Sequence, residues 1–319
     1  MSFNIIGTGM FVPEYTLTNE KITEIVETSD EWIKKRTGIS ERHVCTTENI
    51  TDLCVNASKE ALKNANVAPE DLELIIVATI SSQYSTPAQA CIVQKELGAT
   101  CPAFDVNAAC SGFVYALDVA DGFFARNRIK NALIIAGDQL TSMVDWTDRG
   151  TCVLFGDGAG AVVLENGDSL KSISLTTKGN ISALNAPMAE NTSPFVTYER
   201  KHKPVLNMDG HEVYKFAVSS MVNEIKKVIE MAGLTQDDID HVLPHQANAR
   251  IIDAAIAKLD IPNEKYIKTV EFFGNTSASC MPMALALENS KGRFKKGDII
   301  CLCAFGSGLT TGSCIIEWK

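Results

Sequence analysis

The 319-residue sequence has no run of 18 apolar residues and no basic segment before an apolar stretch at its start. A transmembrane helix needs about 20 consecutive apolar residues, and a secretory signal needs that basic segment. Positive charge is also scarce, since 39 acidic residues outnumber 29 basic ones, whereas general nucleic-acid binding requires clustered cations. We therefore expect a cytoplasmic protein that binds neither membranes nor nucleic acid.

Cysteine pairs of the metal-binding kind are missing as well. The chain has ten cysteines but no CxxC spacing. Most of them lie in apolar runs, where a free cysteine behaves as a small hydrophobic residue, and this usage is typical of a reducing compartment. Cys301 and Cys303 form a CxC pair inside an apolar strand, without the four clustered ligands of a zinc site. We expect no metal ion.

What the chain does contain is an internal repeat. The segment ALKNANVAPEDLELII at 61–76 matches VIEMAGLTQDDIDHVL at 228–243, and NALIIA at 131–136 matches DIICLC at 298–303, both at an offset of 167. The first pair indicates a helix end, a turn and a buried strand in each copy. Two unrelated βαβ segments of similar composition are the alternative. The shared offset favours two similar α/β halves, roughly 1–170 and 171–319, packed as one body.

Several elements can be outlined around the repeat. Ser29 is placed to cap a short helix that Gly38 ends, and Pro87 to open a helix that Gly98 ends. Long helices are predicted over 211–231 and 246–258. The segment 179–204 is rich in Asn and Pro, which indicates an irregular excursion that covers a pocket.

Cys110 stands where a short apolar strand gives way to small residues and then to a helix, in DVNAACSGF at 105–113. Free amides and the helix dipole at such a position stabilise a thiolate and lower its pKa. Taken alone, Cys110 is more simply one more buried cysteine among ten. Its small neighbours leave room for a substrate.

Two polar residues in the second half are candidate partners. His245 follows a buried strand in VLPHQAN at 242–248, and ligands bind at this end of the strands in open α/β sheets. Asn275 precedes a helix in FGNTSAS at 273–279. Alone, a histidine there is more often packed in the core, and an asparagine is more often a cap.

The repeat connects these residues. At offset 167, Cys110 falls on Ser277, two residues from Asn275, so a pseudo-twofold body would bring both helix starts to one central site. The turn around Gly306 can add its backbone amide to that of Cys110 in an oxyanion hole. GDGAGA at 156–161 nearly matches a dinucleotide fingerprint, but apolar residues follow it, so we predict a turn between two strands.

In combination, these blocks resemble the β-ketoacyl-acyl carrier protein synthase III family over essentially the whole chain. The motifs that carry the resemblance are AACSGF at 108–113, PHQAN at 244–248, GNTSAS at 274–279, FGDGAGA at 155–161, FGSGLT at 305–310, and DEWI at 30–33 followed by RTGI at 36–39. The resemblance implies a thiolase-like α/β fold, with two similar βαβ-containing halves layered α-β-α-β-α. It also implies condensation of an acyl-CoA primer with malonyl-acyl carrier protein, which starts type II fatty acid synthesis, by a homodimer without cofactors.

The resemblance also implies roles for residues around the active site. Cys110 would be the acylated nucleophile, with His245 and Asn275 completing the catalytic set, and the amides of Cys110 and Gly306 would form the oxyanion hole. The remaining implied contacts are Trp32 and Arg149 around the adenine of coenzyme A, Arg36 on a phosphate, Gly210 and Asn248 along the pantetheine, and Lys215 and Arg250 facing phosphates or the carrier protein.

Some positions depart from the family pattern. Cys280 and Met281 stand where smaller or aliphatic residues are common, and Thr86 stands where many members that prefer acetyl primers carry Phe. The resemblance implies that the partner subunit contributes Thr86 to the acyl pocket. Two alternatives remain at this point: a related condensing or acyl-transfer enzyme of secondary metabolism that uses another acceptor, and a coenzyme A-binding module without catalysis.

Overall fold

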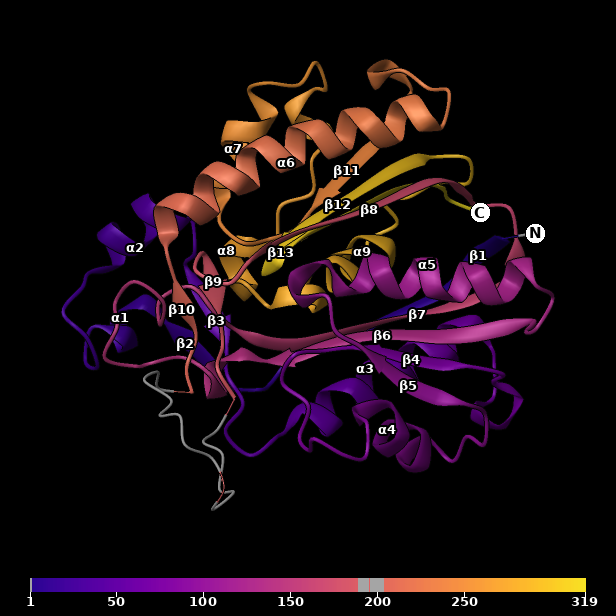
Figure 1. Cartoon of the computed structure of the whole chain (residues 1–319), viewed down its shortest axis with the longest axis horizontal. Helices are drawn as coiled ribbons and strands as arrows, with labels where there is room; N and C mark the ends of the chain where they lie inside the picture. Colours follow the sequence, from indigo (N-terminus) through magenta and orange to yellow (C-terminus); the bar gives the residue numbers. More distant parts are fainter. Residues whose placement is uncertain (1, 189–194, 196–203) are drawn as a thin grey trace.

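Two stacked β-sheets form the framework of the molecule (Figure 1). The computed structural model describes residues 2–188, 195 and 204–319 of the chain. The strands of the first sheet, in spatial order, are β1 (Ser2–Phe11), β7 (Asp157–Gly167), β6 (Asn131–Gln139), β4 (Ile75–Ala78) and β5 (Ala103–Val106). Strand β4 is parallel to both β5 and β6, whereas β7 is antiparallel to β1 and β6.

The second sheet comes from the rest of the chain. Its strands, in spatial order, are β11 (His241–Pro244), β12 (Ile299–Gly306), β13 (Gly308–Glu317) and β8 (Leu170–Asn180). Only β11 and β12 are parallel in this sheet. Because helices cover both faces of each sheet, β4 and β12 consist of apolar residues without polar alternation.

Helices form three layers around the sheets. Figure 1 shows α6 (Gly210–Met231) and α7 (Ala249–Ile256) outside the second sheet, α5 (Gly112–Ala125) and α9 (Cys280–Ser290) between the sheets, and α3 (Ile50–Ala65) and α4 (Gln89–Leu97) outside the first. The core of the central layer joins Phe113 and Leu117 of α5 to Leu285 of α9. This arrangement confirms the expected α-β-α-β-α layering.

Short elements complete the chain at the end of the molecule where the sheets open. They are β2 (Thr16–Thr18), α1 (Asn19–Ile22), α2 (Asp30–Thr37), β3 (Glu41–His43), η3 (Leu140–Ser142), β9 (Leu184–Asn185), β10 (Asn207–Met208) and α8 (Val270–Phe273). The short turn η5 (Asn263–Lys265) lies instead near the start of β11, where Lys265 Nζ bonds the carbonyl of Ile239. Pairing of β9 with β10 means that part of the segment predicted to be irregular is a strand. Its remainder, 189–194 and 196–203, lies outside the described residues. None of the helices within 2–188 and 204–319 combines the length and apolar character needed to span a bilayer.

The predicted repeat is visible as matching helix–turn–strand units. Helix α3, the short 3-10 turn η1 (Pro69–Asp71) and β4 correspond to α6, η4 (Gln236–Asp238) and β11. The two 3-10 turns are 167 residues apart, as the sequence predicts. The boundary between two halves near residue 170 stays a prediction.

Closer to the site the offset becomes 168. The 3-10 turns η2 (Ala109–Ser111) and η6 (Ser277–Ser279) match, and the positive φ angles of Ala109 (48°) and Ser277 (56°) mark equivalent positions. Cys110 therefore corresponds to Ala278, not to Ser277 as the constant offset predicted. The second half therefore has one residue more than the first between the earlier pair of turns, η1 and η4, and this pair. Alignment at a fixed offset misses this change.

Capping residues and glycines in the sequence correctly predicted several helix ends. Ser29 accepts from the Trp32 amide at the start of α2, and Gly38 ends that helix with φ 75°. Gly98 ends α4, but the helix begins at Gln89 rather than at Pro87. Helix α7 begins at Ala249, because the side chain of Asn248 caps it, and not at 246.

The glycine-rich segment at 156–161 is not a turn between strands as predicted, because Gly158 and Gly160 lie within β7. These glycines allow α9 to approach the sheet. A Cβ on Gly160 would lie 2.4 Å from the backbone nitrogen of Met283. The segment opens no helix, so its rejection as a dinucleotide site is confirmed.

Candidate active site

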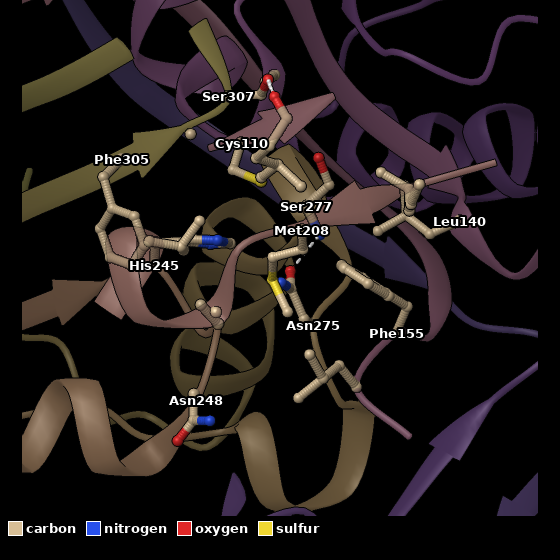
Figure 2. Close-up of a pocket in the computed structure, with 18 of the residues that line it drawn as sticks. Cys110, Leu140, Phe155, Met208, His245, Asn248, Asn275, Ser277, Phe305 and Ser307 are labelled. Carbon is tan, nitrogen blue, oxygen red and sulfur yellow. Dashed lines mark hydrogen bonds between the residues drawn. The ribbon is translucent and has the colours of Figure 1, made fainter. Parts of the chain in front are cut away.

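A cavity of about 930 Å³ lies where the strands of both sheets end. Its walls include Cys110, His245 and Asn275, which are all buried. Figure 2 shows their side chains turned toward one another from three different segments of the chain. Trp32 and Arg149 also line the cavity but are more exposed, so they mark its mouth.

Cys110 lies in the 3-10 turn between β5 and α5 and is 8% exposed. The backbone reaches this turn through Ala109, which adopts a left-handed conformation that is costly for a residue with a side chain. Burial raises the pKa of the Cys110 thiol to about 12. This direction is opposite to the lowering that a helix N-terminus predicts, because removal from water outweighs the local amides.

His245 directly follows β11, and its amide donates to the carbonyl of Cys303 at 2.8 Å. Burial lowers the pKa of the imidazole to about 3, so the ring is neutral near pH 7. The edge of the ring meets Phe305, with the centroids 5.0 Å apart. The neutral ring can donate one hydrogen bond and accept another.

Asn275 is fixed through its backbone and its side chain. Its amide donates to the carbonyl of Leu154 at 2.9 Å, and its carbonyl accepts from Gly156 at 3.1 Å. The side-chain Oδ1 accepts from the Ser277 amide at 2.9 Å, which turns the amide nitrogen Nδ2 toward the cavity (Figure 2). The site therefore offers a side-chain N–H donor beside a neutral imidazole.

Gly306 ends β12 directly against the backbone of the nucleophile turn. A Cβ at this position would lie 2.7 Å from the amide nitrogen of Cys110. Thr310 ties the two segments together, since its Oγ1 donates to the carbonyl of Ala108 at 3.0 Å. This close approach is compatible with the predicted pairing of the Cys110 and Gly306 amides around an oxyanion.

The mouth of the cavity carries an indole with two guanidinium groups close to its ring. The Cζ atoms of Arg149 and Arg36 lie 4.8 Å and 5.7 Å from the centroid of the Trp32 ring. Arg149 is also anchored by a 2.9 Å hydrogen bond from Nη1 to the carbonyl of Glu27. Flat, cationic groups of this kind can stack on a base and pair with phosphates.

Most of the other predicted residues surround the same cavity. Gly210 and Asn248 line it, and Asn248 bonds both the carbonyl of Arg36 and the amide of Arg250. Arg250 lines it too, above the Tyr214 ring. Lys215 is exposed on α6 and is not among the lining residues. Thr86 is likewise exposed and lies outside the cavity of its own chain.

Two family models match the chain, described as 3-oxoacyl-[acyl-carrier-protein] synthase III over residues 104–179 and as its C-terminal part over residues 229–318. A β-ketoacyl-[acyl-carrier-protein] synthase III from Clostridium acetobutylicum is 45% identical over 321 aligned residues, with 99% of each chain covered. The protein of the same name from Aquifex aeolicus is 44% identical, with 100% of each chain covered.

The chain belongs to the β-ketoacyl-acyl carrier protein synthase III family. The crystal structure of a synthase III from Aquifex aeolicus matches with a TM-score of 0.93 at 43% identity, covering 99% of this chain and 100% of that one. The thiolase-like fold predicted from the resemblance is thereby confirmed. As a family member the chain is an acyltransferase of the condensing type.

Sequence reasoning missed the apolar wall and the environment of the imidazole in this synthase III site. Leu140 and Phe155 line the cavity on the side away from His245, and Met208 lines it nearer the centre of the view, beside Asn275 (Figure 2). They come from separate segments, and no spacing in the sequence links them. Cys280 was noted only as a departure, although its sulfur contacts the His245 ring.

Proposed function

We propose that the chain condenses an acyl-CoA primer with malonyl-acyl carrier protein through an acyl thioester on Cys110, releasing 3-ketoacyl-acyl carrier protein and carbon dioxide. One observation carries the proposal: a single cavity contains Cys110, His245 and Asn275 and has the Trp32–Arg149 pair at its mouth. Both relatives named above carry the synthase III name, which favours this reaction over the alternative in secondary metabolism.

In the first half-reaction, the sulfur of Cys110 attacks the thioester carbonyl of acyl-CoA. The amides of Cys110 and Gly306 hold the oxyanion as it forms. The bond from the acyl carbon to the coenzyme A sulfur then breaks, and the thiol proton of Cys110 ends on that sulfur. The proton count therefore balances within the step, and the raised pKa of Cys110 means that the thiol loses its proton as the sulfur–carbon bond forms rather than beforehand.

In the second half-reaction, the malonyl thioester occupies the vacated tunnel. N–H groups of His245 and Asn275 donate to its carbonyl, which stabilises the enolate as carbon dioxide leaves. The enolate carbon attacks the acyl thioester, a carbon–carbon bond forms, and the Cys110 thiolate departs and takes up a proton. Neutral His245 suits this role, because a neutral ring retains a proton to donate.

Residues around the rest of the cavity would bind the substrates. Trp32 and Arg149 would bind the adenine, Arg36 a phosphate, and Gly210 and Asn248 the pantetheine. Lys215 and Arg250 would face phosphates or the carrier protein at the mouth. All steps use groups of the chain and the two thioesters alone, and the reacting protein would be a homodimer.

The experiment that tests the proposal separates the two half-reactions. Cys110→Ala removes the acyl acceptor but leaves both donors, so it should lose primer loading and still decarboxylate malonyl-acyl carrier protein. His245→Ala and Asn275→Ala should load the primer, at a reduced rate for His245→Ala, but decarboxylate about 10²–10³-fold more slowly. Loading is measured by mass of the Cys110 peptide, and decarboxylation by release of labelled carbon dioxide.

The ratio of primer loading to malonyl decarboxylation in each variant decides whether the proposed roles are correct. If Cys110→Ala abolished decarboxylation as completely as His245→Ala does, the division of roles would be wrong. A wild-type protein that binds acyl-CoA but never acylates Cys110 would instead be a coenzyme A-binding module.

A further inference from the structure

The sulfur of Cys280 lies against the His245 ring at its Nδ1 atom. Cys280 Sγ is 3.0 Å from Nδ1, and both residues are buried. Cys280 is the first residue of α9, so a rigid helix between the two sheets holds the sulfur in place. The Phe305 ring packs on the imidazole from another direction and limits its rotation.

The protonation states of the two groups leave only two possible hydrogen bonds between Cys280 and His245. Burial raises the pKa of the Cys280 thiol and lowers that of His245, so both groups are neutral. A neutral imidazole has one N–H and one bare nitrogen. Either Nδ1–H donates to the sulfur and Nε2 is bare, or the thiol donates to Nδ1 and Nε2 carries the hydrogen.

The backbone favours the second arrangement. The amide of Gln246 donates to Cys280 Sγ at 3.3 Å, so the sulfur already accepts one hydrogen bond. A thiol is a weak acceptor, whereas a bare imidazole nitrogen is a strong one. Donation from the thiol to Nδ1 satisfies both groups, while the reverse makes the weakly accepting sulfur take a second hydrogen bond and removes Nδ1 as an acceptor for the thiol hydrogen.

We propose that Cys280 is a positioning residue that fixes His245 in the tautomer with its hydrogen on Nε2. This tautomer presents an N–H, rather than a lone pair, to the malonyl thioester carbonyl. The assignment of the tautomer stands on the contacts of Cys280 alone. Its consequence for catalysis rests on the proposed function, because only decarboxylation uses His245 as a donor.

The tautomer can be read directly by nitrogen-15 NMR of protein with labelled histidine. Bare and protonated ring nitrogens resonate in separate ranges, and the chain has only five histidines. His245→Asn identifies the signals of His245 by their disappearance. In the wild-type protein we expect a protonated Nε2 and a bare Nδ1. A wild-type protein with the hydrogen on Nδ1 would overturn the proposal without any variant of Cys280.

Variants of Cys280 then test the cause. Cys280→Ser keeps a donor and should keep the tautomer, whereas Cys280→Ala should move His245 toward the form with hydrogen on Nδ1. In Cys280→Ala the kcat of malonyl decarboxylation should fall roughly 3- to 10-fold, the scale of one lost hydrogen bond, with KM unchanged. Loading of Cys110 should change less, and Cys280→Ser should restore decarboxylation.

Cys314→Ala is the matched control, because it removes an equally buried thiol that lies outside the cavity. Equal losses in Cys280→Ala, Cys280→Ser and Cys314→Ala would mean that only packing matters, and the proposal would fail. The two proposals fail separately. A wrong tautomer in a protein that condenses both substrates rejects the role of Cys280 alone, whereas the expected tautomer in a protein that cannot decarboxylate malonyl-acyl carrier protein rejects the function.

Discussion

Burial sets the protonation of the two ionisable groups nearest the reaction. The pKa of Cys110 is raised to about 12 and that of His245 is lowered to about 3, so the resting pair is a thiol and a neutral imidazole. No ion pair pre-activates the nucleophile. In the proposed mechanism, acylation therefore depends on the oxyanion contacts and on transfer of the thiol proton to the leaving sulfur.

Trp32 provides a test at the level of a single side chain. Trp32→Ala should raise the KM for acyl-CoA roughly 10-fold or more, since one lost base stack costs ~1–3 kcal/mol. The kcat at saturating acyl-CoA should change little, because Trp32 lies at the mouth and not beside Cys110. Steady-state kinetics with acyl-CoA as the varied substrate measure both. Trp32→Phe retains an aromatic face and serves as the control; an unchanged KM in Trp32→Ala would remove Trp32 and Arg149 from the binding site.

Sequence motifs located the reacting residues but not their protonation. Cys110, His245 and Asn275 stand in short blocks that are specific in combination, so their meeting in one cavity was predictable. The pKa of Cys110 depends on how much protein surrounds the sulfur, which the local sequence does not encode. The contact between His245 and Cys280 joins residues 35 positions apart and depends on where α9 begins.

At the scale of elements, β12 closely approaches the turn at Cys110, where we propose the oxyanion hole. Gly306→Ala should disrupt it, because the new Cβ would lie 2.7 Å from the Cys110 nitrogen and the two segments would have to separate. We expect acylation of Cys110 to slow about 10²-fold, the typical cost of misplacing reacting groups by about 1 Å. Single-turnover acylation by acyl-CoA, followed by mass spectrometry, measures it.

Gly122→Ala is the control for this variant. Gly122 lies in α5, and nothing comes within 4 Å of a Cβ built there. Acylation should be unchanged, and the free energy of unfolding should rise by about 0.5–1 kcal/mol because alanine suits a helix better. Wild-type acylation by Gly306→Ala would show that the amides at this turn do not act on the substrate.

Element ends were predictable where a cap or a glycine marks them, as at Ser29, Gly38 and Gly98. The start of α4 was misplaced because a proline can precede a helix as well as open it. The change of offset from 167 to 168 at the turns η2 and η6 was invisible at a fixed offset. It became apparent only from the matching backbone angles of Ala109 and Ser277.

On the scale of the whole molecule, alternating elements and a repeat predicted an α/β body, and the family motifs predicted its layers. How chains associate is not encoded in the same way. Thr86 is exposed and outside the cavity of its own chain, so it can contribute to an acyl pocket only across an interface with a second copy. We predict a homodimer, which sedimentation equilibrium would detect as twice the mass of one chain.

The predicted dimer would give Thr86 a measurable effect on primer choice. A small residue leaves volume in the partner's pocket, so the wild-type protein should accept butyryl- and hexanoyl-CoA, while Thr86→Phe should shift the ratio of kcat/KM toward acetyl-CoA. Thr86→Ser keeps the small size and should leave that ratio unchanged. A monomer in sedimentation, or a wild-type protein restricted to acetyl-CoA, would contradict the prediction.

The distribution of thiols has a practical consequence. All ten cysteines are free; eight are buried, Cys45 is half-buried, and Cys91 on α4 is exposed. Cys91 lines a surface hollow together with Tyr84 and Pro87, next to Thr86. Cys91 should therefore react with a maleimide dye or a nitroxide label ahead of the other cysteines, and the fluorescence or spin–spin distance of that label would report on the face that is predicted to meet a second copy.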